Sequence, residues 1–313
     1  MKSIAPVALF VYNRLDNTRQ TIAHLLNNTL APRTDLYVFS DGGRDADSWK
    51  QVQAIRSYLQ NLKTEQEGKG LGHITLVFRN ENIYLERNII EGIAQVFESH
   101  DRIIVLEDDI CTSPYYLQYM NDAFETYKDT PQVMHVSGFT NLNLHLDHPI
   151  YFTPHMSGWG WGTWRDRWQK HFRHFTSREE ALANFSSADL HRIEYQGVFP
   201  CLKSLDKHPI PWDICWELAI YRAKGLCLTP CHTMVRNIGL YNGTHFQHSR
   251  LLQSFNFDRK PWPHQVTIPL LTPEENPVIE EMFRNAIRHW GIRYTLLGHI
   301  ARFFYLRLKG IKK

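Results

Sequence analysis

Short apolar runs recur through the first 110 residues of the chain. Four of them have the length of a strand and are apolar at consecutive positions: "PVALFVYN", "DLYVFSDGG", "HITLVFRN" and "RIIVLEDD". Unbroken runs of this length are typical of strands that are buried on both faces, as in parallel sheets covered by helices. We therefore expect four core strands in this part of the chain.

Helical patterns lie between these runs. Asp16 stands where it can cap a helix over "NTRQTIAHLL". Residues 82–98 carry apolar side chains at the spacing of one helix face, namely Ile89, Ile90, Ile93, Val96 and Phe97. Strands that alternate with helices predict an α/β fold, with a mostly parallel central sheet flanked by helices.

The second half of the chain has a different character. The run "QVMHVSGF" predicts a further strand, and a helix begins near Trp212. Prolines interrupt the chain after residue 256, and a helical pattern resumes near residue 277. We expect one domain over residues 1–255, made of a first half (1–130) and a second half (131–255), followed by a helical C-terminal extension over residues 256–313.

Three polar clusters directly follow the ends of predicted strands. They are Asn13-Arg14, Ser40-Asp41-Gly42-Gly43 and Glu107-Asp108-Asp109. The carboxyl ends of parallel strands meet at one edge of a sheet, which is where nucleotides bind in open α/β folds. Three adjacent carboxylates repel one another, so the last cluster predicts a positive charge nearby. Carboxylate oxygens suit Mg²⁺ or Mn²⁺, ions that bridge proteins to substrate phosphates.

A tryptophan-rich segment, "MSGWGWGTWRDRW", contains four Trp residues in thirteen positions. Aromatic clusters usually belong to a hydrophobic core. Here glycines alternate with the tryptophans, and glycine allows a backbone to approach a ligand closely. We therefore expect Trp159 and Trp161 to form a wall of a sugar-binding site.

The segment "PWDICWE" places Asp213 at the start of a helix. An acid in this position often does no more than complement the helix dipole. Between Trp212 and Trp216, however, it would be partly desolvated, which raises the pKa of a carboxylate and makes it a better proton acceptor. Glu217, one turn further on, is the reserve candidate. Further along, "NGTHF" carries His245 on a Gly-containing loop that could close on a diphosphate.

Composition excludes several classes of protein. The chain has 313 residues, a net charge of +3 and an ordinary globular composition, so no nucleic-acid partner is expected. Five irregularly spaced cysteines suit neither a disulfide framework nor a zinc site, and reduced thiols are the simpler interpretation. Neither a signal sequence nor an apolar run of about 20 residues is present. We therefore expect a cytoplasmic protein.

The charge is distributed unevenly. Residues 284–313 contain eight Lys or Arg and no Asp or Glu, so the first 283 residues carry about −5 (3 minus 8). Basic and apolar residues interleave in this tail, which is typical of a helix with a basic face. Such a helix can pack on the body of the protein. Alternatively, it can dock on the anionic cytoplasmic leaflet of the inner membrane as a peripheral contact.

The order "PVALFVYNR", "FSDGG", "AQVFE", "IIVLEDD", "SGWGWGTW", "PWDICWE" and "NGTHF" resembles the N-acetylglucosaminyltransferase I family of inverting, metal-dependent glycosyltransferases. The similarity spans residues 6 to about 250. It implies the glycosyltransferase-A fold, a nucleotide-binding first half and an acceptor-binding second half. Bacterial relatives of this type usually occur with polysaccharide biosynthesis proteins.

The resemblance also implies roles for individual residues. It makes Asp109 the ligand of Mn²⁺ or Mg²⁺ and Asp213 the catalytic base. On the donor it places Asp108 at the ribose, Glu107 at the sugar, Arg14 at the diphosphate and Asp41 at the uracil, with Thr244 and His245 on a loop that closes over it. Asn88 stands where the family has a base-contacting His, and "GWGW" replaces the family's "GLGW".

These observations predict an enzyme that moves a sugar from a nucleotide-sugar donor, a UDP-sugar, to a hydroxyl group with inversion. The acceptor would be a bacterial surface polysaccharide or a lipid-linked oligosaccharide. Two alternatives stay open. A sugar nucleotidyltransferase needs a Gly-rich, basic loop after the first strand, which "YNRLDNT" does not provide. A non-catalytic carbohydrate-binding protein of the cell surface would need a secretion signal.

Overall fold

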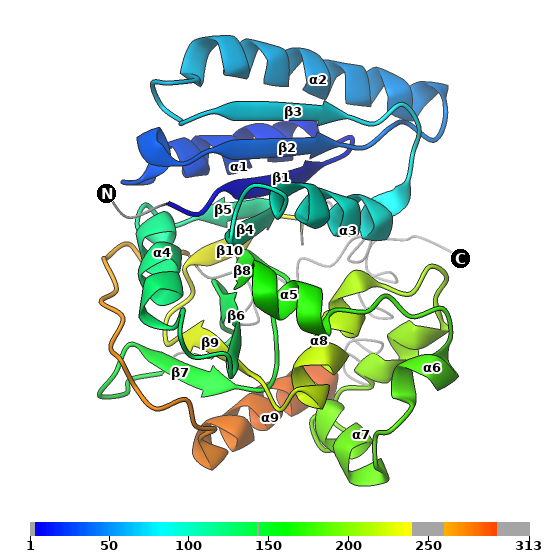
Figure 1. Cartoon of the computed structure of the whole chain (residues 1–313), viewed down its shortest axis with the longest axis vertical. Helices are drawn as coiled ribbons and strands as arrows, with labels where there is room; N and C mark the ends of the chain where they lie inside the picture. Colours follow the sequence, from blue (N-terminus) through cyan, green and yellow to red (C-terminus); the bar gives the residue numbers. More distant parts are fainter. Residues whose placement is uncertain (1–3, 143, 240–259, 293–313) are drawn as a thin grey trace, which may run out of the picture.

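One eight-stranded sheet runs through the molecule, in the order β3-β2-β1-β4-β8-β6-β9-β7. The computed structural model describes residues 4–142, 144–239 and 260–292. Figure 1 shows the sheet twisting from β3 at one end of the molecule to β7 at the other. The strands are β1 (Val7–Val11), β2 (Leu36–Ser40), β3 (Ile74–Phe78), β4 (Arg102–Glu107), β5 (Ile110–Thr112), β6 (Val133–Ser137), β7 (Ile150–Thr153), β8 (Trp161–Trp164), β9 (Leu226–Pro230) and β10 (Val235–Asn237). β10 and β5 form a separate antiparallel pair.

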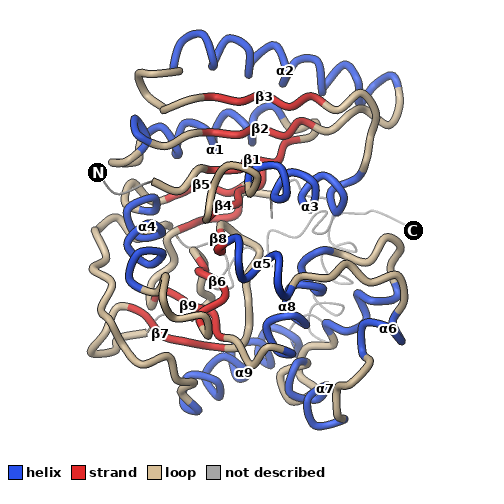
Figure 2. Tube along the Cα trace, viewed as in Figure 1, coloured by secondary structure: helices blue, strands red, loops and turns tan. Residues whose placement is uncertain are grey.

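Helices cover both faces of the sheet, as Figure 2 shows. They are α1 (Leu15–Leu26), α2 (Ala46–Gln66), α3 (Tyr84–Val96), α4 (Tyr116–Thr126), α5 (Arg165–His171), α6 (Arg178–Leu182), α7 (Ser187–Ile193), α8 (Trp212–Arg222) and α9 (Pro277–Ile292), with 3₁₀ turns η1 (Ala31–Arg33) and η2 (Cys201–Asp206). Leu9 of β1 packs with α1, α2 and α4 in one core, whereas Phe10 packs with α3, α5 and α8 in another. The alternation of side chains along each strand separates these two layers.

The predicted α/β architecture is confirmed. β1 to β4 pair in parallel, and every residue of β1 is buried, as the unbroken apolar run indicated. β8 is the exception at the centre of the sheet, because it runs antiparallel to both β4 and β6. The sheet is therefore mixed and continues from the first half of the chain into the second.

Two local expectations need correction. Asp16 does not cap α1: the helix begins at Leu15, so Asp16 lies inside the first turn, where its charge complements the helix dipole. From the sequence we expect the glycines of the tryptophan-rich segment to let a ligand approach, but part of this segment forms the strand β8. Gly162 lies in β8, and a Cβ atom there would meet the carbonyl oxygen of Ile103 at 2.5 Å. Gly162 therefore allows β8 and β4 to lie close together, and it does not face a ligand.

The segment after residue 260 lies along the second half of the sheet. The Trp262 amide donates to the Thr233 carbonyl at 2.8 Å, and Glu275 forms an isolated bridge with Phe152 of the edge strand β7. Ile279 at the start of α9 is buried, and Phe283 packs on the same cluster. α9 therefore docks on the body of the protein, and the predicted helix is confirmed as far as residue 292.

Candidate functional site

The acidic cluster Glu107-Asp108-Asp109, here called the acid triplet, lies next to a positively charged side chain of the protein itself. β1 and β4 are neighbours in parallel register, with Phe10 opposite Glu107, so the residues after both strands share one edge of the sheet. Arg14 reaches across this edge. Its Nη2 atom lies 2.9 Å from Asp109 Oδ2 and also forms an ion pair with Asp108 Oδ1. The structure therefore brings together the first and third predicted clusters.

Burial and mutual repulsion raise the pKa values of this cluster. Burial, followed by the charges of Asp109 and Asp108, raises the pKa of Glu107 to about 8. Burial raises the pKa of Asp108 to about 6 in spite of the Arg14 charge, and it raises the Asp109 pKa as well. Burial lowers the Arg14 pKa, but the two aspartates more than offset this effect. The cluster thus carries more negative charge than one arginine satisfies, which favours a further cation.

Residues after β10 form the wall beside Asp109. The Ile238 amide donates to the Asp109 carbonyl at 2.8 Å, and the Gly239 amide donates to Asn237 Oδ1 at 2.7 Å. A Cβ atom on Gly239 would lie 2.0 Å from Asp109 Oδ2, so only glycine fits here. This contact has no local signal in the sequence, because it depends on the pairing of β10 with β5.

Asp41 and Asn88 lie in the part of the edge next to β2. Asp41 Oδ1 accepts from the amides of Gly42 and Ile83, both at 2.9 Å, and Oδ2 accepts from Asn82 Nδ2 at 3.0 Å. Asn88 is buried on α3, where its Oδ1 accepts from Arg79 Nε at 3.1 Å. Sequence reasoning missed Asn82 and Arg79. A role of Asp41 or Asn88 toward a base remains a prediction, although Asp41 Oδ2 retains a lone pair for a further donor.

Asp213 comes to the same region from the second half of the chain. It lies at the N-terminal end of α8, and its exposed side chain contrasts with the buried residues that follow it. Although the carboxylate reaches solvent, the protein around it is dense enough for desolvation to raise its pKa. The charge of Asp213 also raises the pKa of Glu107, so these two carboxylates lie close enough to interact. The sequence predicted both residues, and the fold places them together.

The two tryptophans predicted to line a sugar site have different environments. Trp161 is fully buried, with its indole stacked on His135 (ring centroids 5.2 Å apart) and on Trp212 (5.0 Å). Because the Trp161 side chain is fully buried by protein, it has no surface left for a sugar ring, so this prediction is wrong. Trp159 is half-buried and packs edge-to-face on Phe139 at 4.6 Å. Its role as a wall stays a prediction.

The remaining predicted residues have mixed outcomes. Glu217 is buried and bonded to His155 Nδ1 at 3.1 Å and to the Met156 amide at 2.8 Å. Both carboxylate oxygens therefore serve the protein itself, which is at odds with a direct contact between Glu217 and an acceptor. Thr244 and His245 lie outside the described residues.

The donor set suits a divalent ion that is only partly held by protein. The described residues contain no group of three His, Cys, Asp or Glu side chains arranged to hold a metal. Asp109 nevertheless offers hard carboxylate oxygens, and the Gly239 backbone lies close against them because this residue has no side chain. Mg²⁺ and Mn²⁺ often take one or two carboxylates and complete their coordination with substrate phosphates and water. The site fits such an ion together with a diphosphate.

Comparison with known proteins gives one informative likeness. No protein-family model matches the chain. Over 177 residues, 53% of its length, the chain is 23% identical to alpha-1,3-mannosyl-glycoprotein 2-beta-N-acetylglucosaminyltransferase of Arabidopsis thaliana. The match covers 39% of that enzyme, so the chain spans about two fifths of the length of this curated relative. The name of this relative agrees with the family whose motifs the sequence resembles.

Two solved structures are similar only in outline. UDP-glucose pyrophosphorylase complexed with UDP-glucose has a TM-score of 0.40 at 10% identity, over 72% of this chain and 90% of that one. The mannosyltransferase PcManGT from Pyrobaculum calidifontis, in complex with GDP-Man and Mn²⁺, has a TM-score of 0.36 at 13% identity, over 71% and 76%. Likenesses at this level carry no conclusion about function.

Proposed function

We propose that this protein is a metal-dependent, inverting glycosyltransferase that transfers a sugar from a nucleotide-sugar, a UDP-sugar, to a hydroxyl group. The observation that carries the proposal is that two carboxylate sites, from the two halves of the chain, lie close enough for their charges to interact. One is the triplet Glu107-Asp108-Asp109 with Arg14, and the other is Asp213. The sequence similarity to an N-acetylglucosaminyltransferase supports it.

The donor side of the site is built to balance charge. Asp109 and Asp108 would hold the metal and the ribose, and Arg14 lies beside them, where it would face the diphosphate. When bound, a divalent ion would neutralise the negative charge that develops on the leaving diphosphate. Glu107 lies in the same cluster, where burial raises its pKa, and its carboxyl group would form a hydrogen bond with a donor-sugar hydroxyl. Asp41 and Asn88 would form the base-binding end, and Thr244 and His245 a loop over the donor.

The acceptor side requires a base. A sugar hydroxyl is a poor nucleophile at neutral pH, so a carboxylate must take its proton as the new glycosidic bond forms. Inversion places the attacking oxygen opposite the leaving diphosphate, and the base must therefore lie across the donor sugar from Asp109. Asp213 fits because it belongs to another element, α8, and its side chain reaches solvent. Its raised pKa improves it as a proton acceptor.

The acceptor would be a bacterial surface polysaccharide or a lipid-linked glycan. One face of α9 packs on the body through Ile279 and Phe283, whereas Val278 and Met282 are exposed. These exposed apolar residues precede the basic tail, which would meet the membrane that carries a lipid-linked acceptor. Among the helices that the structure describes, none combines the length and apolar character that a membrane crossing requires.

The test is a screen of nucleotide-sugars for Mn²⁺-dependent hydrolysis and transfer, combined with calorimetry of UDP binding. The Asp109→Ala variant should keep its fold and lose metal-dependent binding, because it removes the carboxylate that receives the ion. Asp101→Ala is the matched control. Asp101 is exposed and lies just before the N-terminal end of β4, whereas Asp109 lies beyond its C-terminal end. UDP–Mn²⁺ binding that is unchanged in Asp109→Ala would refute the assignment. Pyrophosphate release in place of sugar transfer would identify a nucleotidyltransferase, and binding without turnover a carbohydrate-binding protein.

A further inference from the structure

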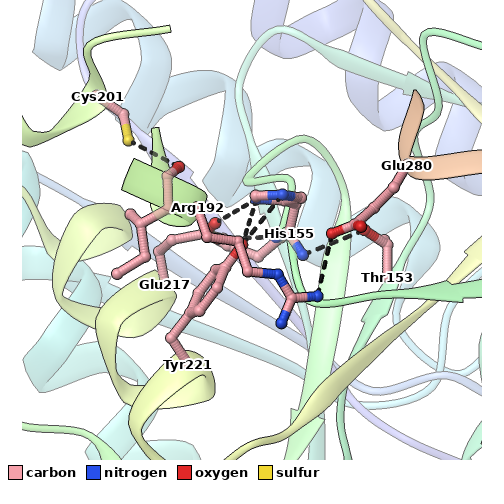
Figure 3. A network of polar contacts seen from close by, with 9 residues as sticks. Thr153, His155, Arg192, Cys201, Glu217, Tyr221 and Glu280 are labelled. Atoms are coloured by element: carbon pink, nitrogen blue, oxygen red, sulfur yellow. Dashed lines mark hydrogen bonds and ion pairs between the residues drawn. The ribbon is translucent and has the colours of Figure 1, made fainter. Parts of the chain in front are cut away.

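A buried polar network lies behind the helix that carries Asp213. Glu217 follows Asp213 by four residues on α8, and Figure 3 shows it among side chains from several other elements. Its Oε1 atom lies 3.1 Å from His155 Nδ1, and its Oε2 atom accepts from the Met156 amide at 2.8 Å. The hydroxyl of Tyr221, one turn further along α8, lies 3.1 Å from His155 Nε2.

These bonds fix the position of the segment 155–160, which enters the tryptophan-rich strand β8. The same segment also passes close to the start of α8, since a Cβ atom added to Gly158 would lie 3.4 Å from the Trp212 indole. Trp212 is the residue before Asp213. The bonds of Glu217 and Tyr221 therefore hold the segment 155–160 on α8, and the segment runs close to Trp212 at the end of the helix that carries the proposed base.

The C-terminal extension closes the network from the other side. The His155 ring stacks on Tyr195 with centroids 3.7 Å apart, and Tyr195 stacks on Phe283 of α9 at 5.3 Å. Arg192 of α7 forms ion pairs with Glu275 and, at 3.1 Å, with Glu280 of α9. In Figure 3, Glu217 of α8 and Glu280 of α9 lie on opposite sides of His155. His155 is thus held between α8 and the extension.

We propose that Glu217 is a positioning residue for the acceptor half of the transfer. It orients the segment 155–160 and the start of α8 toward each other, and so sets the place of Asp213 without touching the substrate. This inference rests on the proposed function, and it replaces the expectation that Glu217 contacts the acceptor or acts as a reserve base. A carboxylate is needed because it offers two strong acceptors, one for each of its partners.

The charge of Glu217 has a second consequence for Asp213. Desolvation raises the Asp213 pKa, and the charges of Glu217 and of Glu86 on α3 raise it further, whereas Lys207 lowers it. Glu107 of β4 interacts with the same carboxylate. Removal of the Glu217 charge should therefore lower the Asp213 pKa. Because Asp213 acts in its ionised form, the acidic limb of the pH–rate profile, where the transfer rate falls as the pH is lowered, should move to lower pH.

The experiment compares Glu217→Gln with Glu281→Gln, a matched control on the exposed face of α9. In Glu217→Gln we expect the kcat of transfer to fall roughly 10- to 100-fold, because small misplacements of a catalytic group cost this much. The Kd for UDP–Mn²⁺ should stay unchanged, and the acidic limb should shift to lower pH. Glu217→Asp keeps the charge and should return the limb to its wild-type position.

A readout that is independent of activity tests the geometry itself. Hydrogen exchange of the full chain should quicken over residues 155–160 and at the start of α8 in Glu217→Gln, and not in the control. Unchanged exchange, or a wild-type kcat and pH limb, would overturn the proposal. If the wild-type protein uses no nucleotide-sugar while the exchange still quickens, the proposed function fails and the positioning by Glu217 stands.

Discussion

Arg14 and Asp213 show how single residues acquire their chemistry from neighbours that are distant in sequence. Arg14 is half-buried between β1 and α1, and its partners Asp108 and Asp109 lie more than 90 residues away. In the structure it satisfies part of the charge of the acid triplet, and a divalent ion with its diphosphate would have to share Asp109 with this guanidinium. Donor binding should therefore depend on both charges together.

Replacement of Asp213 by Asn tests the proposed base. Asn keeps the size of the side chain and removes its ability to take a proton, and general-base catalysis is worth ~10²–10⁴ in rate, so kcat should fall by that order. The Kd for the UDP-sugar should barely change, since Asp213 would serve the acceptor. Transfer rate and donor Kd are measured together on the same preparation.

The pH dependence provides a further check on Asp213. Its pKa is raised above the ordinary value of an aspartate, and the base is active when ionised. As the pH is lowered, the wild-type rate should therefore begin to fall at a higher pH than a base with the ordinary aspartate pKa would give. Near-wild-type turnover in Asp213→Asn would remove this residue from the mechanism, and a lost Kd with intact fold would move it to the donor site.

At the scale of elements, β8 and α8 are joined by a stack of aromatic rings. Trp161 of β8 stacks on His135 of β6 and on Trp212 of α8. The ring centroids of Trp168 of α5 and Trp216 lie 5.0 Å apart. Burial lowers the pKa of His135 to about 3, so this ring stays neutral at physiological pH. The stack ties the helix of the proposed base to the centre of the sheet.

The two tryptophans should differ in their effect on stability. Trp161→Ala should lower the free energy of unfolding by about 3–5 kcal/mol, because it leaves a cavity in a closed core. Trp159→Ala should cost less, since its indole is half-buried. Urea titration monitored by circular dichroism measures both values. Equal losses in the two variants would contradict the assignment of Trp161 to the core alone.

At the scale of the whole molecule, the C-terminal extension connects the body to a strongly basic tail. The extension runs along the second half of the sheet, and its described residues end with α9. Ion pairs of Arg192 with Glu275 and Glu280 connect the start of this helix to α7. Helix α9 contains the first part of the basic tail, as far as Ile292. The structure of residues 293–313 lies outside the described residues, so membrane contact stays a prediction from the sequence.

Deletion of residues 293–313 tests this prediction. It leaves α9 intact and removes six of the eight basic residues of the tail. Each basic residue near an anionic surface contributes about 1 kcal/mol, so the full chain should sediment with anionic vesicles at low salt and be released at high salt. The shortened chain should stay in the supernatant, as should the full chain with neutral vesicles. Equal sedimentation of both chains with anionic vesicles would exclude the tail as the contact.

The sequence alone determined the parallel layer of the fold and the position of the acid triplet. Both are local properties: an unbroken apolar run specifies a strand with two buried faces, and the residues after it necessarily fall at the strand's carboxyl end. The same logic identified Arg14 and Asp41, and the prolines before Trp212 indicated the start of α8 and the place of Asp213.

Only the tertiary structure decided which of these residues act together and which belong to the core. Trp161 resembled a ligand wall because its neighbours are glycines, but its rings are covered by His135 and Trp212, which are far away in the chain. Glu217 finds its partner His155 across 62 residues, and Gly239 reaches Asp109 across 130 (239 minus 109). Local periodicity fixes which way a side chain faces along its own element. The partner on that face depends on how distant elements pair and pack, and this is set by the lowest free energy of the whole chain.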